Sequence, residues 1–279
     1  MQIRERAVER LSIGRREFLA GMIAGVARRP LWASQAPEMV ARWAAHFDQI
    51  GTRGVIAIRK PDGTIAVSDP VRAAIGYLPA STFKIPNTLI ASDLGVVSGA
   101  DEKFVWDGEV HSLNGKPFDA WNRDLTLRDA FSVSAIWVYQ EIARRIGKER
   151  MAARLSALRY GNADIESAPI DQFWLHGKLR ISALEQIDFL DRLWRGDVPA
   201  SRKAIDTTRQ IMWMEKGPNG SLYGKTGWTT DQNIGWFVGV IETQNAFHPF
   251  ALNLDMPTID LAPHRVAIVK AVASELGMW

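Results

Sequence analysis

A serine and a lysine stand three residues apart in the segment Pro79-Ala80-Ser81-Thr82-Phe83-Lys84. If a helix begins here, Ser81 and Lys84 lie on one face, where a lysine can take the proton of the hydroxyl. A desolvated lysine can be such a base, and the N–H groups of a helix start can stabilise an oxyanion. Because about one Ser-x-x-Lys occurs by chance in such a chain, a helix cap with a surface lysine is the alternative.

Lys225-Thr226-Gly227 is a second candidate, and it falls within a predicted strand over 221–228. In a strand, Lys225 and Gly227 face one way and Thr226 faces the other. A glycine in a strand often marks the close approach of another group, although a solvated edge strand is the alternative. Ser134 and Tyr160-Gly161-Asn162 add polar groups to an apolar block. Taken singly, these further candidates are explained by ordinary caps and turns.

Residues 1–36 are typical of an export signal. A basic stretch leads to Gly14-Arg15-Arg16-Glu17-Phe18-Leu19, an apolar run covers 19–27, and Ser34-Gln35-Ala36 is a candidate cleavage site. The arrangement is similar to a twin-arginine signal, which directs the export of folded proteins. We therefore expect the protein in the periplasm or outside the cell. A surface amphipathic helix is the alternative interpretation of this segment.

The composition excludes several other kinds of chemistry. The 279 residues include no cysteine, so disulfides, thiol nucleophiles and cysteine-based metal sites are ruled out. The five histidines show no ligand spacing and no glycine loop resembles a phosphate cradle, so neither a metal nor a bound cofactor is expected. After residue 36 the charges nearly balance and no long apolar run occurs. Nucleic-acid binding and stable membrane insertion are therefore not expected.

Residues 37–279 are predicted to form one folded unit of the α+β class. We expect an amphipathic helix over 37–50 that buries Met39, Val40, Trp43 and Phe47, followed by strands over 54–60 and 64–69. The pattern is mainly helical from about 77 to 200, most clearly over 129–146. Strands return over 221–228, 234–243 and 248–256, the last one half-buried, and Pro263 opens a final helix.

The order of these elements favours two lobes. Successive terminal strands with short links pair antiparallel. We expect a central antiparallel sheet with flanking terminal helices, formed by about 37–76 and 201–279, and an inserted all-helical lobe of about 77–200. A site is expected in the cleft between the lobes.

Taken in order, four short motifs resemble the signature motifs of class D (oxacillinase-type) serine β-lactamases. They are Ser81-x-x-Lys84, Ser134-Ala135-Ile136, Tyr160-Gly161-Asn162 and Lys225-Thr226-Gly227. Residues 104–108, 121–128, 173–177 and 236–239 share the resemblance, which extends from about 40 to 277. It implies the fold of serine β-lactamases and penicillin-binding proteins.

The resemblance also implies a role for each matched residue. Ser81 would attack the lactam carbonyl. Lys84, carboxylated on its side-chain nitrogen by CO2 or bicarbonate, would be the general base in acylation and deacylation, and Trp174 would hydrogen-bond the carbamate. Ser134 would pass the proton to the lactam nitrogen in the field of Lys225.

The same resemblance assigns substrate contacts and structural positions. Thr226, Gly227, Trp228 and Arg265 would bind the substrate, with Thr226 and Arg265 at its carboxylate and the N–H groups of Ser81 and Trp228 at the oxyanion. Phe83, Ile136, Tyr160, Gly161 and Asn162 would be structural motif positions.

The local sequence agrees with a carboxylated lysine and shows two departures from the family pattern. CO2 adds only to an uncharged amine, and burial among apolar side chains lowers the pKa of a lysine. Phe83, Val133, Ile136, Trp174 and Leu175 would supply that apolar surround. Ile136 replaces the usual valine and is expected to alter carboxylation or the route of water. Trp137, where a small residue or proline is common, is expected to narrow the cleft.

The implied activity is hydrolysis of β-lactams such as penicillins and oxacillins by a monomer or homodimer. Two alternatives remain open. One is a sensor or scavenger that is acylated without turnover. The other is a D,D-peptidase, an enzyme class that shares the Ser-x-x-Lys and Lys-Thr-Gly motifs.

Overall fold

The computed structural model describes residues 36–113 and 115–279, so the predicted export signal, apart from Ala36, lies outside the described residues. The strands are β1 (Glu38–Met39), β2 (Gly54–Arg59), β3 (Ile65–Val67), β4 (Lys103–Phe104), β5 (Ser112–Leu113), β6 (Lys116–Pro117), β7 (Leu125–Thr126), β8 (Trp213–Lys216), β9 (Gly220–Thr229), β10 (Ile234–Thr243) and β11 (Phe247–Asp255). The α-helices are α1 (Ala45–Asp48), α2 (Pro70–Ala73), α3 (Lys84–Asp93), α4 (Leu127–Ser132), α5 (Ile136–Ile146), α6 (Lys148–Leu158), α7 (Ala183–Arg195), α8 (Arg202–Met212) and α9 (Ala262–Glu275). Short 3₁₀ helices cover Ala41–Ala44, Ala80–Phe83 and Ile259–Leu261.

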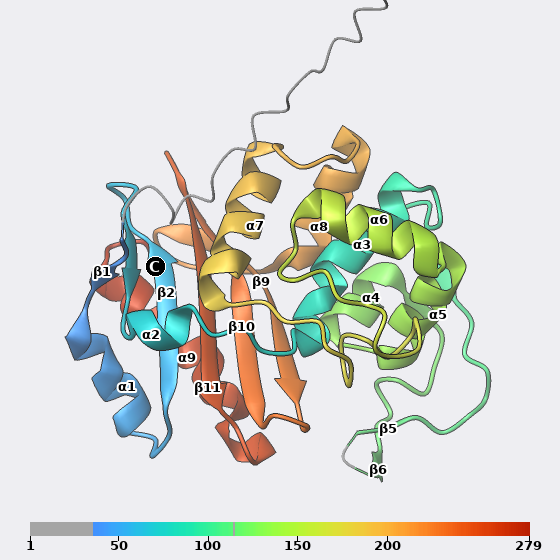
Figure 1. Ribbon diagram of the computed structural model, residues 1–279, viewed down its shortest axis with the longest axis horizontal. Coiled ribbons are helices and arrows are strands. Elements are labelled where there is room, and N and C mark those ends of the chain that lie inside the picture. Colours follow the sequence, from blue (N-terminus) through green and yellow to red (C-terminus); the bar gives the residue numbers. More distant parts are fainter. Residues whose placement is uncertain (1–35, 114) are drawn as a thin grey trace, which may run out of the picture.

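Seven strands form one sheet in the order β1-β3-β2-β11-β10-β9-β8 (Figure 1). Neighbouring strands are antiparallel except for the short parallel contact between β1 and β3. The N-terminal and C-terminal parts of the chain meet where β2 pairs with β11, with Ala57 opposite Ala251. The predicted α+β fold with a central antiparallel sheet is therefore confirmed.

Helices cover both faces of the sheet, and an apolar core lies on each side (Figure 1). One core joins the sheet to the helices of the middle segment, and the other lies under α9 and the helical turns before β2. Strand β11 is buried on both faces, since Ala251 belongs to the first core and Leu252 to the second. The prediction of a half-buried strand was wrong because a second helical layer covers its other face.

The helix predicted over 129–146 is two helices. Helix α4 ends at Ser132, helix α5 begins at Ile136, and Ser134 between them has a φ of 61°. Apolar periodicity continues across the break because Phe131 and Val138 face the same core, so the pattern does not record the interruption. A positive φ at a residue other than glycine is uncommon and is found most often where surrounding structure and function require it.

Two other segments differ from their predicted roles. The helix expected over 37–50 begins only at Ala41, because Glu38 and Met39 pair with β3, and Met39 is exposed. Residues 202–212 were expected to belong to the sheet lobe. They form α8, which packs against α3 and α4. Strands resume at Trp213, the first residue of β8.

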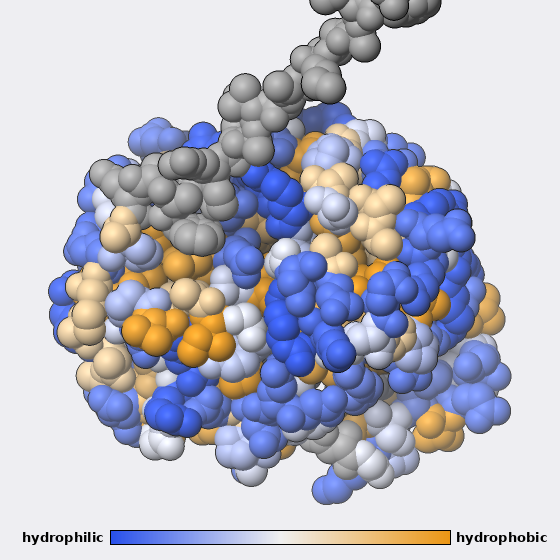
Figure 2. Space-filling view, viewed as in Figure 1, coloured by the Kyte–Doolittle hydropathy of each residue, from blue (hydrophilic) through white to orange (hydrophobic). Residues whose placement is uncertain are grey.

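The surface seen in Figure 2 is mainly hydrophilic, with an apolar patch over α2. The exposed apolar residues on and beside this helix are Val71 and Ile75. Within residues 36–113 and 115–279, none of the helices has the length and apolar character that a membrane span requires.

Candidate active site

Ser81 lies in the 3₁₀ helix Ala80–Phe83, which leads directly into α3. This turn brings Ser81 and Lys84 onto one face, as their spacing predicts, and Lys84 Nζ lies 3.0 Å from Ser81 Oγ. Ser81 is half-buried, whereas Lys84 is only 1% exposed. The hydroxyl can therefore meet a substrate while the amine next to it is shielded from water.

The residue before Ser81 has a strained backbone. Ala80 has a φ of 48°, and its N–H donates to the carbonyl oxygen of Trp174 at 3.1 Å. On the preceding side, the N–H of Leu78 donates to Gln232 Oε1 at 2.7 Å, and the indole N–H of Trp236 donates to the Leu78 carbonyl at 2.9 Å. Strain of this kind persists only where the surroundings hold it, and here two distant parts of the chain do so.

The surroundings of Lys84 favour its uncharged form. Burial, together with the nearby charge of Lys225, lowers the pKa of Lys84 well below its usual value. Its Nζ lies 5.1 Å from the centroid of the Tyr139 ring. Tyr139 is an addition to the predicted apolar surround. It follows Ile136 by three residues and so shares that face of α5.

Trp174 lies against the turn that carries the nucleophile. Its ring stacks on Phe83, the residue before Lys84, with centroids 5.3 Å apart and planes 17° apart. The indole N–H of Trp174 is buried and has no hydrogen-bond partner within the described part of the chain. A buried donor left unpaired costs about 1–3 kcal/mol, so this position favours an acceptor.

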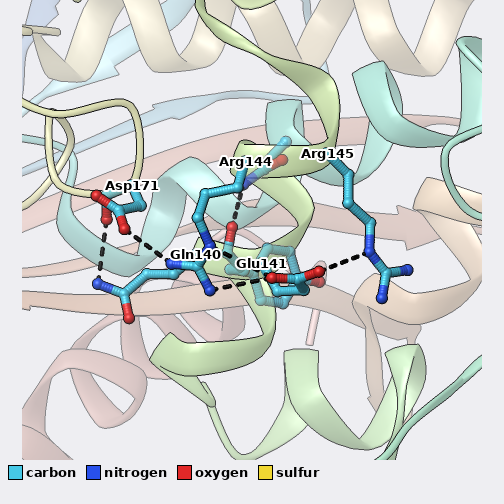
Figure 3. Close-up of polar contacts among 7 residues, drawn as sticks. Gln140, Glu141, Arg144, Arg145 and Asp171 are labelled. Carbon is cyan, nitrogen blue, oxygen red and sulfur yellow. Dashed lines mark hydrogen bonds and ion pairs between the residues drawn. The ribbon is translucent and has the colours of Figure 1, made fainter.

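Helix α5 anchors the loop between α6 and α7, residues 159–182, which carries Trp174 (Figure 3). Gln140 Nε2 donates to the carbonyl oxygen of Asp171 at 3.2 Å, and Arg144 Nη1 pairs with Asp171 Oδ2 at 2.8 Å. Ser134 lies two residues before Ile136, the first residue of the same helix. One helix therefore positions both the indole and the second serine of the site.

Strand β9 approaches the nucleophile closely at Gly227. A Cβ atom at this position would lie 3.1 Å from the Pro79 carbonyl oxygen and 3.2 Å from the Ser81 backbone nitrogen. Contacts this tight explain why a residue without a side chain stands here.

Lys225 faces the same side of β9 as Gly227, as predicted. Its Nζ lies 5.7 Å from the centroid of the Phe131 ring, near the end of α4, and Lys225 is 4% exposed. Burial, with a smaller effect of Arg265, lowers the pKa of Lys225 to about 7. Phe131 and Tyr139 therefore place the two lysines against the helices that flank Ser134.

Arg265 contacts β9 at the residue that follows Thr226. Arg265 lies in the first turns of α9, and its Nη1 donates to the Gly227 carbonyl oxygen at 2.6 Å. Burial lowers the pKa of Arg265 to about 10. Lys225 Nζ lies 3.0 Å from the carbonyl oxygen of Thr226 and 3.5 Å from its Oγ1. Since β8 pairs only with residues 221–223, no strand of the described residues lies along the edge of β9 beside Thr226.

The Tyr160-Gly161-Asn162 motif does not reach the nucleophile and joins chain segments instead. Asn162 Oδ1 accepts from the N–H of Arg180 at 2.9 Å, beyond the loop that carries Trp174. Gln186 Nε2 donates to the Tyr160 hydroxyl at 3.3 Å and to Thr82 Oγ1 at 3.2 Å. Through Gln186, the motif is thus linked to Thr82 in the turn that carries Ser81, and it supports that turn.

The two departures from the family pattern lie at the start of α5. Ile136 and Trp137 are half-buried against the large core. The indole N–H of Trp137 donates to the Trp121 carbonyl oxygen at 2.9 Å, and its ring stacks on His111 with centroids 5.5 Å apart. Trp137 is therefore held against His111 and Trp121. The side chain of Trp228 is also engaged elsewhere, because its indole N–H donates to the Met256 carbonyl oxygen at 2.8 Å.

A polar link joins the Trp174 loop to the turn between β9 and β10. The sequence pattern does not predict it. His176 Nδ1 and Asp231 Oδ2 lie 2.9 Å apart, with side chains 53% and 43% exposed. The next residue, Gln232, holds Leu78. The pair is separated by 55 residues, and no local pattern brings them together. In residues 36–113 and 115–279, no group of three His, Cys, Asp or Glu side chains could hold a metal ion.

Comparisons with known proteins agree with this geometry. A family model described as "Penicillin binding protein transpeptidase domain" matches residues 66–276. β-Lactamase OXA-48 from Klebsiella pneumoniae is 39% identical over 257 residues, which cover 91% of this chain and 94% of that protein. β-Lactamase OXA-10 from Pseudomonas aeruginosa is 37% identical over 242 residues, which cover 85% and 89%.

Solved structures show the same relationship. The class D β-lactamase YbXI from Nostoc matches with a TM-score of 0.81 and 38% identity, covering 86% of this chain and 100% of that one. FUS-1 (OXA-85) from Fusobacterium nucleatum subsp. polymorphum matches with a TM-score of 0.81 and 36% identity, covering 86% and 99%. With its fold and this similarity taken together, the chain belongs to the class D serine β-lactamases, enzymes that hydrolyse β-lactams.

Proposed function

We propose that this protein hydrolyses β-lactams through an acyl-enzyme on Ser81, with N-carboxylated Lys84 as the general base in acylation and deacylation. The observation that carries the proposal is the 3.0 Å contact between Ser81 Oγ and a buried amine whose pKa is lowered. A lysine with its usual pKa would be charged at pH 7 and could neither accept a proton nor react with CO2.

The unpaired indole N–H of Trp174 supports the carboxylated form. Its ring stacks on Phe83, the residue directly before Lys84. Carboxylation would supply an anionic oxygen base at Lys84 and an acceptor for this donor. The residues present therefore fit the modification that the family resemblance implies.

The other residues would bind and orient the substrate. The close approach of Gly227 sets the Ser81 N–H beside the backbone of β9, where it and the Trp228 N–H would stabilise the oxyanion. Ser134 would pass the proton to the lactam nitrogen in the field of Lys225. Thr226 and Arg265, which bonds to the carbonyl oxygen of the next residue, Gly227, would receive the substrate carboxylate.

Turnover of nitrocefin and of benzylpenicillin, with and without bicarbonate, tests the proposal. Lys84→Ala should lower kcat by about 10²-fold or more with an unchanged circular dichroism spectrum, because the base is removed. Lys203→Ala, which removes an exposed lysine from α8, should behave as the wild type.

Carbon-13 NMR with labelled bicarbonate should give a carbamate resonance in the wild type and none in Lys84→Ala. A bare amine at mildly alkaline pH, or a wild-type rate in Lys84→Ala, would contradict the assigned base. Intact mass spectrometry after exposure to a penicillin should show a transient adduct. A persistent adduct would instead indicate a sensor or scavenger.

We also propose export by the twin-arginine route, on the evidence of Arg15-Arg16 before an apolar run. Replacing both arginines with lysine should retain the protein in the cytoplasm. The matched replacement of Arg28 and Arg29 should leave export unchanged. Equal export of the two variants would contradict the assignment.

A further inference from the structure

A cavity of about 380 Å³ opens beside Lys225 and Thr226. Those two residues line one end of it, and the other walls are formed by α4, by the last turn of α8 and by the first residues of β8. Its volume is within the range of small-molecule sites. The cavity therefore borders the proposed substrate site at Lys225 and Thr226.

A β-bulge shapes the far end of this cavity. Trp213 pairs with Tyr223 and Glu215 pairs with Leu222, so Met214 is an extra residue on β8. Side chains alternate between the two sides of a regular strand, and an inserted residue interrupts this alternation. As a result, the adjacent apolar residues Trp213 and Met214 both line the cavity.

These two side chains are open to solvent. Trp213 is 54% exposed and Met214 is 37% exposed. Within the stretches 36–113 and 115–279, Trp213 is the only aromatic residue among the large exposed apolar side chains. An uncovered indole face in a cavity beside a substrate site offers a surface on which an aromatic group can stack.

The position of Trp213 along β9 relates it to the orientation of the substrate. Gly227 lies against the Ser81 nitrogen, and Trp213 stands opposite Tyr223, four residues earlier on β9. At a rise of about 3.3 Å per residue, Trp213 is about 13 Å from Gly227 along the strand. If the β-lactam carbonyl lies at Ser81 beside Gly227 and its carboxylate lies at Thr226, the line from one to the other runs along β9 toward Tyr223. The substituent of the carboxylate-bearing ring would then point toward Trp213.

The charges along the cavity narrow the class of substituent. Arg128 and Lys225 both line the cavity, and Arg128 Nη2 also lies 3.4 Å from Asp101 Oδ1. The carboxylate of Asp129 accepts hydrogen bonds from the N–H and hydroxyl of Thr126, so it is committed to capping α4. The basic lining therefore disfavours a cationic group, and the electron-rich indole of Trp213 favours stacking with a neutral or electron-poor ring.

We propose that Trp213 and Met214 form a specificity subsite for β-lactams that carry a neutral or electron-poor aromatic group on the carboxylate-bearing ring. The subsite rests on the proposed function, because the orientation of the substrate follows from Ser81 and Thr226. The cephalosporin nucleus, whose six-membered ring carries such a substituent next to the carboxylate, is the chemical class that reaches it.

Two cephalosporins test the subsite. Nitrocefin and cephalothin share a thienylacetyl side chain and differ in the ring substituent, which is dinitrostyryl in nitrocefin and acetoxymethyl in cephalothin. In Trp213→Ala, kcat/KM for nitrocefin relative to cephalothin should fall about five- to tenfold, the scale of one lost aromatic contact. The loss should lie in KM, because stacking is made equally before and in the transition state.

Control variants separate stacking from general damage. Trp213→Phe should restore most of the nitrocefin preference, since it keeps a ring on β8. Val71→Ala, which shortens an exposed side chain on α2 beside the far part of the sheet, should keep the wild-type ratio. An unchanged ratio in Trp213→Ala would overturn the subsite.

Turnover of benzylpenicillin distinguishes failure of the subsite from failure of the proposed function. Normal benzylpenicillin turnover with an unchanged cephalosporin ratio would overturn the subsite alone. Absent benzylpenicillin turnover in the wild type would overturn the proposed function, and the subsite with it. Sedimentation equilibrium tests whether a second copy of the chain covers Trp213 and Met214 in solution. A dimer that dissociates in Trp213→Ala would show that it does, and would also overturn the subsite.

Discussion

The buried side chain of Lys225 should make the protein more stable as the pH rises above neutrality. Its pKa is about 7 in the folded protein, against a usual value of 10.5, chiefly because burial disfavours the charged form. Between these two values the unfolded chain binds more protons than the folded one. The free energy of unfolding therefore increases with pH across this window.

The magnitude follows from the same two values. At pH 7 the unfolded lysine is fully protonated and the folded one is about half protonated, so linkage gives a gain of about 2 kcal/mol between pH 7 and pH 9. Lys84 contributes in the same direction, because burial also lowers its pKa. Lys225→Met should remove the share of Lys225, and should be more stable than the wild type at pH 7.

Urea unfolding at pH 7, 8 and 9, followed by tryptophan fluorescence, measures this difference. Bicarbonate-free buffer keeps Lys84 as an amine. Lys203→Met, which replaces an exposed lysine of α8, should keep the wild-type pH slope. Parallel slopes for the wild type and Lys225→Met would refute the reasoning, because they would mean that Lys225 has the same pKa in both states.

Three further predictions concern the geometry of the site. Trp174→Ala should slow deacylation more than acylation and steepen the dependence on added bicarbonate, and a wild-type rate in single-turnover kinetics would reject its role. Gly227→Val should slow acylation about a hundredfold or more, because its side chain would meet the Pro79 carbonyl oxygen and the Ser81 nitrogen at the oxyanion position, as burst kinetics can show. Asp231→Ala should lower kcat with little change in Tm, because the exposed pair with His176 links the Trp174 loop to β9 and β10. The exchange His176→Asp with Asp231→His should recover part of that kcat, and no recovery would count against a positioning role.

Elements with a strong local signal were predicted to within a residue or two. Strand β10 has the bounds that its apolar run predicted, and Pro263 does open the last helix. Predictions failed where two different structures give the same apolar pattern in the sequence. The apolar spacing of 129–146 suits one helix or two, and only packing against a shared core allows the break at Ser134.

The sequence by itself determined the parts of the site that depend on short-range geometry. Ser81 and Lys84 meet because one helical turn joins them, and Lys225 and Gly227 share a side because strand side chains alternate. These relations hold wherever the segments form a helix and a strand.

Tertiary structure alone decided the chemical state of these groups. The lowered pKa of Lys84 depends on burial and on the charge of Lys225, 141 positions away in the chain. The strained turn at Ala80 depends on Trp174, and the open end of the cleft depends on a bulge in β8. Desolvation and charge repulsion act through space, so they are set by which distant segments pack together and not by neighbours in the sequence.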